Sequence, residues 1–272
     1  MANENAKPTA GPEASRPSPH DPEFSVVVPV RDEAENVGQL IDEILAAMAP
    51  LAPIEMVFVD DGSRDATAAE LKNRLAAAPE LRVIRHRTPA GQSAAIVTGV
   101  RRARGAVIVT LDGDGQNDPK DIPALVAVFR GAADPDRLLV TGLRARRMDS
   151  LLKRISSRVA NRVRSGLLGD RTPDTGCGLK VFSRRAFLDM PSFDHMHRFL
   201  PALMLRQGGE VVSVPVNHRP RRKGRTKYGL FDRLGAGIVD LFGVLWLMRR
   251  IRLPEIEADE PDRGSGRRGN RP

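Results

Sequence analysis

The chain has 272 residues, of which 41% are hydrophobic and 28% charged, and its formal net charge is +9. That length is enough for one large α/β domain or for a domain with an appendage. The single cysteine, Cys177, excludes an internal disulfide framework and a cysteine-rich zinc site, and it favours a reducing compartment. The basic charge favours anionic partners, but one Trp and one Tyr leave few stacking platforms for single-stranded nucleic acid.

Strand-like and helical patterns alternate between two terminal segments of low complexity. Residues 1–22 and 254–272 lack hydrophobic periodicity and are rich in Pro, Gly or charge, so both are predicted to be disordered tails. Strands are predicted at 24–30, 54–59, 81–85, 106–111, 138–142 and 211–216, and helices at 36–48, 65–78, 91–104 and 119–129. This alternation predicts a largely parallel sheet with helices on both faces. Ligands of such sheets bind beyond the carboxyl ends of the strands.

Two carboxylates, Asp112 and Asp114, follow the fourth predicted strand in the segment DGDGQ. Carboxylates two residues apart in extended chain point the same way and repel each other. A hard cation such as Mg²⁺ or Mn²⁺ removes this repulsion by binding carboxylate oxygens together with diphosphate oxygens. A solvated Gly/Asp turn is the alternative, and the pattern alone leaves both interpretations open.

Acidic residues also follow the first two predicted strands. Asp60 and Asp61 end the second strand, and Glu33 and Glu35 come shortly after the first. Carboxylates at strand ends can accept hydrogen bonds from a ribose or a base. Turn formation, helix capping and the helix dipole are the alternatives for these residues. Three acidic strand ends in one fold nevertheless predict a pocket.

Four segments, in matching order, resemble family 2 glycosyltransferases of the GT-A fold. They are FSVVVPVRDE at 24–33, VDDGS at 59–63, GQSAAI at 91–96 and LDGDGQNDP at 111–119. Within that family the likeness is to polyprenyl-phosphate glycosyltransferases of the dolichol-phosphate mannosyltransferase type, over about residues 24–250. The resemblance implies an α/β, Rossmann-like GT-A domain over residues 23–230, with a mostly parallel sheet and flanking helices.

The resemblance also implies roles for individual residues. The expected nucleotide-sugar-binding residues are Pro29, Val30, Glu33, Asp60, Asp61, Gln92, Asp112 and Arg222. The expected ligands of Mg²⁺ or Mn²⁺ are Asp112, Asp114 and Gln116. The expected catalytic residues are Asp114, Asp174, Arg225 and Lys227. The chain departs from the family pattern at Pro89, where an Asn is common, and at Lys180, where Arg is more usual.

Asp174 belongs to the segment PDTGCGLK, which resembles the acceptor-side segment of these enzymes. An Asx-turn with Thr175 is its alternative role. The basic loop at 218–229 resembles a flexible segment that clamps diphosphate or lipid phosphate with Arg222, Arg225 and Lys227. As a bare charge run, such a loop is often only a solvated surface.

Two further segments point to a membrane surface. Residues 151–168 predict a basic amphipathic helix, Arg164 included, that faces anionic headgroups or the prenyl phosphate. Residues 231–253 predict an apolar helix, too short at 234–248 to span a bilayer, with Phe242 and Trp246 as membrane anchors. Burial in the core or in a homo-oligomer interface is the alternative. Related enzymes often carry transmembrane helices beyond this point, whereas this chain continues into a polar tail, so we expect a peripheral protein.

The sequence therefore predicts an inverting, metal-dependent glycosyltransferase. It would transfer a sugar from a GDP- or UDP-sugar to a polyprenyl phosphate at the cytoplasmic face of the cell membrane. Three alternatives stay open: a related enzyme with a soluble or polysaccharide acceptor, a nucleotide-sugar-binding protein without turnover, and a basic nucleic-acid-binding protein. Because no nucleic-acid-binding motif is visible, we do not expect a nucleic-acid partner.

Overall fold

A computed structural model describes residues 21–51, 53–144, 164–170, 172–220 and 230–252. Both predicted tails lie outside the described residues except for positions 21 and 22. The described chain forms one seven-stranded sheet in the order β3-β2-β1-β4-β6-β5-β7. The strands are β1 (Phe24–Val30), β2 (Ile54–Asp60), β3 (Leu81–Arg85), β4 (Val107–Thr110), β5 (Leu138–Arg144), β6 (Lys180–Ser183) and β7 (Glu210–Val216).

The sheet is mostly parallel, as predicted, with one exception. Strand β6 pairs antiparallel with both β4 and β5, whereas the other neighbouring pairs are parallel. The sequence analysis missed β6, because four residues directly after a Gly-containing turn carry no readable period. The antiparallel strand brings the chain back towards the DGDGQ segment, so that Gly178 and Lys180 lie next to it.

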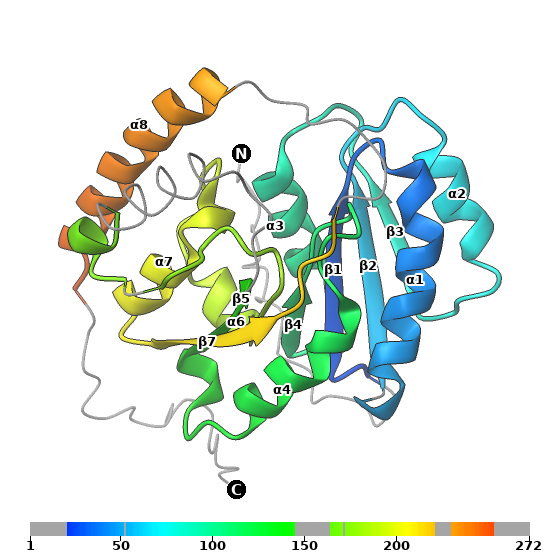
Figure 1. Ribbon diagram of the computed structural model, residues 1–272, viewed down its shortest axis with the longest axis horizontal. Helices are drawn as coiled ribbons and strands as arrows, with labels where there is room; N and C mark the ends of the chain where they lie inside the picture. The colour runs from blue at the N-terminus through cyan, green and yellow to red at the C-terminus, as the bar shows by residue number, and fades with distance from the viewer. Residues whose placement is uncertain (1–20, 52, 145–163, 171, 221–229, 253–272) are drawn as a thin grey trace, which may run out of the picture.

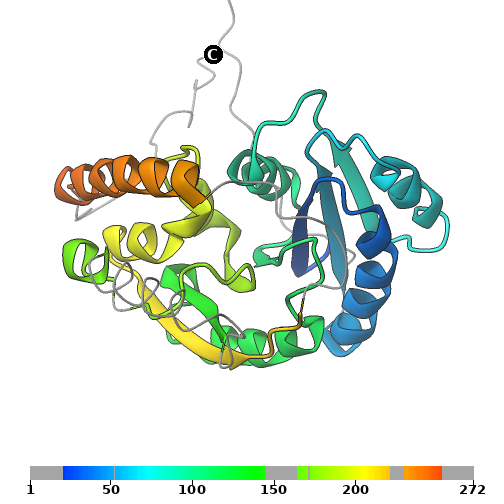
Figure 2. The same ribbon diagram turned by 45° about the horizontal axis from the view of Figure 1, so that its top comes forward.

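Helices cover both faces of the sheet (Figures 1 and 2). The helices are α1 (Ala34–Met48), α2 (Thr67–Arg74), α3 (Gln92–Arg102), α4 (Ile122–Arg130), α6 (Arg184–Leu188), α7 (Leu200–Arg206) and α8 (Leu230–Arg249). Short 3₁₀ turns occur at Ala49–Leu51, Pro119–Asp121, Pro135–Arg137 and Met196–Arg198. Apolar side chains of α1, α2 and α4 fill one core layer, and those of α3, α6, α7 and α8 fill the other. Strand β1 contributes to both layers, which explains its unbroken apolar sequence.

Helix α2 is shorter than the predicted 65–78. It starts at Thr67, whose backbone N–H donates to Asp65 Oδ1 at 2.9 Å, so Asp65 stabilises the start of the helix as expected. It ends at Arg74, where the following backbone N–H groups fold back on Arg74 O. The proline at position 79 disfavours helical backbone only in the residue before it, so the helix ends earlier than the proline requires.

The predicted basic helix at 151–168 is described only over residues 164–168, which are helical. One part of that prediction is wrong, since Arg164 does not face outwards. Its side chain is buried and lies 3.2 Å from Asp170, which is itself fully buried. Arg164 also donates to Thr172 O at 2.9 Å, so this arginine fixes the entry to the acceptor-side segment.

Helix α8 packs along the outside of α7, where Figure 1 shows it as the orange helix. Val244 is buried in the core layer, and Leu241, Leu245 and Met248 pack against that layer. Arg206 of α7 donates to Leu247 O at 3.0 Å, which satisfies one carbonyl of the last turn of α8. Among the described residues, no helix combines the length and the hydropathy that crossing a bilayer requires.

Candidate active site

The carboxyl ends of β1, β2 and β4 meet at one edge of the sheet, as the parallel order requires. Val30 of β1 lies beside Asp60 of β2 in the strand register. The loop after β4 packs directly on β1: a Cβ added to Gly113 would lie 2.5 Å from Val30 Cγ1 and 2.9 Å from Pro29 O. Glycine is required there for this close approach. Pro29 and Val30 therefore support the DGDGQ loop from below.

The DGDGQ loop is held by its own polar groups. Asp112 donates its backbone N–H to Asn117 Oδ1 at 3.1 Å, and Gln116 donates its backbone N–H to Asp114 Oδ1 at 3.1 Å. Gly115 has a φ of +72°, a conformation that favours glycine. The loop thus places Asp112, Asp114 and Gln116 on one short turn, rather than in the extended chain expected for the two carboxylates.

Asp112 lies at the junction of the loop and a polar pocket. Gln92, the first residue of α3, donates to Asp112 Oδ1 at 2.8 Å. Burial and the negative charge of Asp114 raise the pKa of Asp112 to about 6, against the opposing effect of Lys180 and Arg144. A carboxylate with a raised pKa beside a second carboxylate is the environment that a divalent cation would stabilise.

The donor set fits such a cation. Among the described residues, no group of three or more His, Cys, Asp and Glu side chains forms a complete metal cage. Two carboxylates and the Gln116 amide are instead a partial set of hard oxygen ligands. Mg²⁺ and Mn²⁺ are commonly bound by one or two carboxylates, with water and substrate phosphates as the other ligands.

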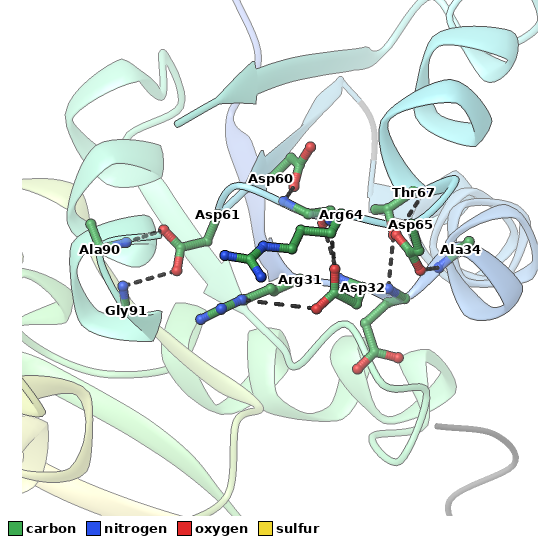
Figure 3. A network of polar contacts seen from close by, with 12 residues as sticks. Arg31, Asp32, Ala34, Asp60, Asp61, Arg64, Asp65, Thr67, Ala90 and Gly91 are labelled. Atoms are coloured by element: carbon green, nitrogen blue, oxygen red, sulfur yellow. Dashed lines mark hydrogen bonds and ion pairs between the residues drawn. The ribbon is translucent and has the colours of Figure 1, made fainter. Parts of the chain in front are cut away.

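Asp61 is used by the protein itself rather than directed into open space (Figure 3). Its two oxygens accept the backbone N–H groups of Ala90 at 2.7 Å and Gly91 at 2.9 Å, and Oδ1 also lies 2.8 Å from His86 Nδ1. Burial alone would raise the pKa of Asp61, but these hydrogen bonds outweigh it and lower the pKa. Asp61 therefore positions the loop that leads into α3 and hence Gln92.

Asp60 and Glu33 are likewise held by nearby groups. Fully buried Asp60 accepts the backbone N–H of Ser63 at 2.8 Å and pairs with Arg85 Nε at 3.1 Å. Glu33 accepts from Asn36 Nδ2 at 2.6 Å, while its backbone N–H donates to Thr67 Oγ1 at 2.8 Å. Both carboxylates lie at the predicted edge of the sheet. Asp60 makes the turn contact that the sequence left open, whereas the Glu33 side chain makes no capping hydrogen bond to α1.

Two arginines extend between the acidic turns in Figure 3. Arg31 lies 3.9 Å from Asp32 Oδ2, and the backbone N–H of Arg64 donates to Asp32 Oδ1 at 2.7 Å. Asp32 has a φ of +50°, a strained conformation for a residue other than glycine. The sequence analysis singled out neither Asp32 nor these arginines.

The acceptor-side segment is fixed by a buried ion pair. Arg144, the last residue of β5, donates from Nε to Asp174 Oδ2 at 2.6 Å and from Nη2 to Asp174 Oδ1 at 2.7 Å. Burial lowers the pKa of Arg144, but the pair with Asp174 outweighs it and leaves the pKa raised. Asp174, 5% exposed, is thus brought to the site, but as the partner of an arginine that the sequence analysis missed. No sequence motif marks Arg144. It lies beside Asp174 because β5 ends at this residue.

The pocket lies between the DGDGQ loop, the first turn of α3 and the acceptor-side segment. Its lining includes Gln92, Asp112, Thr175, Gly176, Lys180, His197 and Arg198. A Cβ on Gly178 would lie 2.4 Å from the Asp112 carboxylate, so only glycine lets the two segments meet. Sequence reasoning missed His197 and Arg198, because they lie in a short 3₁₀ turn without a strand end or motif to mark them.

The basic loop begins next to the same site. Arg219 donates its backbone N–H to Gln116 O at 2.9 Å, and its guanidinium pairs with Glu43 and Asp118, both at 2.5 Å. These contacts hold the chain after β7 against the DGDGQ loop. The three predicted phosphate-binding residues that follow lie outside the described residues: Arg222, Arg225 and Lys227.

Together, the sheet order, the two-carboxylate loop and the adjoining polar pocket define a glycosyltransferase of the GT-A type. The chain belongs to glycosyl transferase family 2, whose family model matches residues 25–190. The family assignment made from the four sequence segments is thereby confirmed.

Two relatives illustrate the match. Dodecaprenyl-phosphate galacturonate synthase of Rhizobium johnstonii is 36% identical over 233 residues, which cover 84% of this chain and 68% of that protein. Undecaprenyl-phosphate 4-deoxy-4-formamido-L-arabinose transferase of Pectobacterium carotovorum is 35% identical over 208 residues, or 75% of this chain. The chain spans 62% of the length of that second relative.

Solved structures show the same fold. The mannosyltransferase PcManGT of Pyrobaculum calidifontis, in complex with GDP-Man and Mn²⁺, has a TM-score of 0.62 at 20% identity, covering 90% of this chain and 69% of that one. Glucosyl-3-phosphoglycerate synthase of Mycobacterium tuberculosis, in complex with Mn²⁺, UDP and glucosyl-3-phosphoglycerate, has a TM-score of 0.59 at 20% identity. That alignment covers 84% of this chain and 80% of the synthase. At these identities the likeness shows the fold alone.

Proposed function

We propose that this glycosyltransferase transfers a sugar from a nucleotide diphosphate donor to a polyprenyl phosphate. The observation that carries the proposal is the pocket that joins Asp112 of the DGDGQ loop to Lys180 of the acceptor-side segment. A diphosphate held at the loop and a phosphate acceptor held opposite would meet in this space. Both relatives carry names of polyprenyl-phosphate sugar transferases, which supports the same acceptor class.

On the donor side, Asp112, Asp114 and Gln116 would hold Mg²⁺ or Mn²⁺. When bound, the cation supplies neutralisation of the charge that builds on the departing diphosphate. Asp61 keeps the loop before α3 in place, so that Gln92 can hold Asp112 at 2.8 Å. Pro29, Val30, Glu33 and Asp60 form the edge on which the nucleoside would rest, and Arg222 would add a contact to the diphosphate.

On the acceptor side, the protein needs no strong general base, because a phosphate monoester is already an anionic nucleophile. Its oxygen would attack the sugar C1 from the face opposite the diphosphate, with inversion. Asp174, paired with Arg144, orients the segment that lines this side. Arg225 and Lys227 would add positive charge around the reacting phosphates.

Helix α8 supports a membrane-surface location. Its outward face exposes Ile238 (50%), Val239 (71%), Phe242 (62%) and Trp246 (59%), which recur at helical spacing. Arg249 and Arg250 close the helix, and Arg250 lies over the Trp246 ring at 5.9 Å. An apolar stripe with an aromatic residue and flanking arginines matches helices that lie in the interface of anionic bilayers. We propose that the protein is peripheral on the cytoplasmic membrane face, with α8 as its contact.

The decisive experiment measures transfer of label from a panel of radiolabelled UDP- and GDP-sugars into organic-extractable lipid. Purified protein and a polyprenyl phosphate are incubated with Mn²⁺, with Mg²⁺, or with EDTA. A metal-dependent lipid product from one donor would support the proposal and identify both the sugar and the preferred cation. Metal-dependent donor binding without a lipid product would instead point to a soluble or polysaccharide acceptor.

Membrane contact is tested separately by sedimentation with vesicles that contain anionic phospholipid. Replacing Phe242 and Trp246 by Ser should release the protein into the supernatant, because their exposed side chains are the proposed anchors. Leu75→Ser is the control, because the Leu75 side chain is also exposed, at 42%, but lies in the helix layer on the other face of the sheet. If the double variant still sediments but loses a dimer in light scattering, α8 is an oligomer interface instead.

A further inference from the structure

His197 lines the pocket but has no part in the metal and diphosphate contacts described above. Its Nδ1 lies 2.7 Å from Ser93 Oγ, on the first turn of α3. The preceding residue, Gln92, holds Asp112 at 2.8 Å. Two adjacent side chains of one helix therefore fix the proposed cation ligand and His197 at the same pocket.

The contacts of Ser93 favour one of the two neutral tautomers of His197. The backbone N–H of His197 donates to Ser93 Oγ at 3.3 Å, so the oxygen already accepts one hydrogen bond. Among the described residues, His197 Nδ1 is the one acceptor within reach of the Ser93 hydroxyl proton. With Nδ1 accepting, a neutral imidazole carries its proton on Nε2. No described group bonds Nε2, which leaves its N–H to a ligand.

The ring stays neutral at physiological pH. Burial lowers the pKa of His197 to about 3, and the positive charges of Lys180, Arg198 and His195 add to that effect. A neutral ring with a proton on Nε2 is a hydrogen-bond donor and neither a general acid nor a general base there.

The neighbouring charges favour an anionic ligand. Lys180 is 3% exposed and donates from Nζ to Cys177 O. In the described part of the chain, no carboxylate forms an ion pair with it, and burial lowers its pKa although Cys177, Asp112 and Asp174 favour the charged form. A buried ammonium without a paired anion is costly, and a bound anion would relieve that cost.

We propose that His197 is a specificity-determining residue whose Nε2–H donates a hydrogen bond to an anionic oxygen of a substrate, next to Lys180. Ser93 acts through His197 as a positioning residue. The inference rests on the proposed function, in which, apart from the donor diphosphate held at the DGDGQ loop, two groups carry such oxygens. One is the phosphate of the lipid acceptor, and the other is the carboxylate of a uronic-acid donor.

A binding experiment tests this without turnover. The full chain is labelled with ¹⁵N-histidine, and the His197 signal, one of five histidines, is assigned by its loss in His197→Gln. We expect the Nε2–H tautomer at pH 7 and a shift of that resonance when inorganic phosphate or glucuronate is added. Ser93→Ala should give a mixture of tautomers. An Nδ1–H tautomer, or no response to either anion, would overturn the proposal even if lipid transfer is observed.

Kinetics then separate the two sources. His197→Ala should raise one KM by about tenfold or more, the loss expected for a hydrogen bond to a charged group. A rise for the polyprenyl phosphate assigns the acceptor phosphate, whereas a rise confined to uronic-acid donors assigns the carboxylate. His197→Gln, whose amide can donate from a similar position, should recover most of the loss. Unchanged KM values for both substrates contradict the proposal.

The matched control is His195→Asn, two residues away. His195 pairs with Asp240 of α8 at 2.9 Å, does not line the pocket, and has a φ of +61° that asparagine tolerates. It should leave both KM values unchanged. If the wild-type chain makes no lipid product from any donor, the proposed function fails, while the anion titration still decides the role of His197.

Discussion

The two sides of the pocket satisfy their buried carboxylates in different ways. On the β1–β2 side, Asp60 and Asp61 accept backbone N–H groups of the turns after β2 and β3, and the arginine that pairs with Asp60, Arg85, is 57% exposed. On the β5–β6 side, Asp174 is neutralised by the guanidinium of Arg144, 30 residues earlier in the chain. Hydrogen bonds from backbone groups hold a loop in shape, whereas a buried ion pair also fixes a charge beside the reacting groups. The donor side is thus held in shape by backbone hydrogen bonds, whereas the acceptor side carries a fixed charge.

Between these two sides lies the DGDGQ loop, where the largest effect is expected. Asp114→Asn should lower the transfer rate by about 10³-fold, because the proposed cation loses a charged ligand and the departing diphosphate loses its neutralisation. The isosteric amide keeps the Oδ1 acceptor for Gln116 N, so the melting temperature should stay unchanged. Initial rates with Mn²⁺ and a thermal scan check both parts. Asp136→Asn, on the exposed turn before β5, is the control, and equal rates for the two variants would refute the assignment.

The ion pair on the acceptor side should dominate stability. Asp174→Ala leaves the Arg144 guanidinium, whose side chain is 17% exposed, without its partner. Breaking a buried pair in this way costs about 3–5 kcal/mol of the free energy of unfolding. Urea denaturation measures the loss. Asp134→Ala, which breaks the exposed pair with Arg137, should cost less than about 1 kcal/mol, and similar losses for both would contradict the comparison.

Substitution on the donor side should lower the free energy of unfolding by less. Asp61→Ala leaves the backbone N–H groups of Ala90 and Gly91 without their acceptor and should cost about 1–3 kcal/mol in urea denaturation. Because the loop also positions Gln92, donor affinity should fall in isothermal titration with the metal present. Asp42→Ala, an exposed pair with Arg74, is the control. Full donor affinity in the Asp61 variant would remove the proposed link between this loop and Asp112.

The last effect is a pH dependence that belongs to the acceptor side. The pKa of His197 is about 3 in the folded chain and returns to about 6.5 on unfolding, so the unfolded state binds more protons between these values. The contribution of His197 to the free energy of unfolding is therefore fully present above about pH 6.5. As the pH falls below that value, this contribution is lost by about 1.4 kcal/mol per pH unit. Other groups also titrate, so the measurement is the difference in unfolding free energy between wild type and His197→Gln at pH 7 and pH 5. An equal loss in both proteins would show that His197 is not buried in its neutral form.

Much of the fold and half of the site could be predicted from the sequence. Unbroken apolar strands such as β1 and the acidic residues directly after them mark the carboxyl edge, because parallel strands bring their ends together. The DGDGQ loop was recognisable for the same reason, whereas Gln92 and Asp174 were marked by the resemblance to family 2 glycosyltransferases. Trp246 and Phe242, predicted as surface anchors, are indeed exposed, although what they contact stays a prediction.

The remaining features depend on contacts between segments far apart in the chain. The antiparallel β6 brings Gly178 against Asp112 and buries Lys180, which no local period announces. Arg164 was expected outside and lies inside, because Asp170 offers it a buried partner. The sequence by itself thus determined the parallel strands and the edge at which they end, and it predicted the chemistry of the donor side. Only the tertiary structure decided how the acceptor side is charged, because Arg144, Lys180 and His197 acquire their roles from distant partners rather than from their neighbours in the chain.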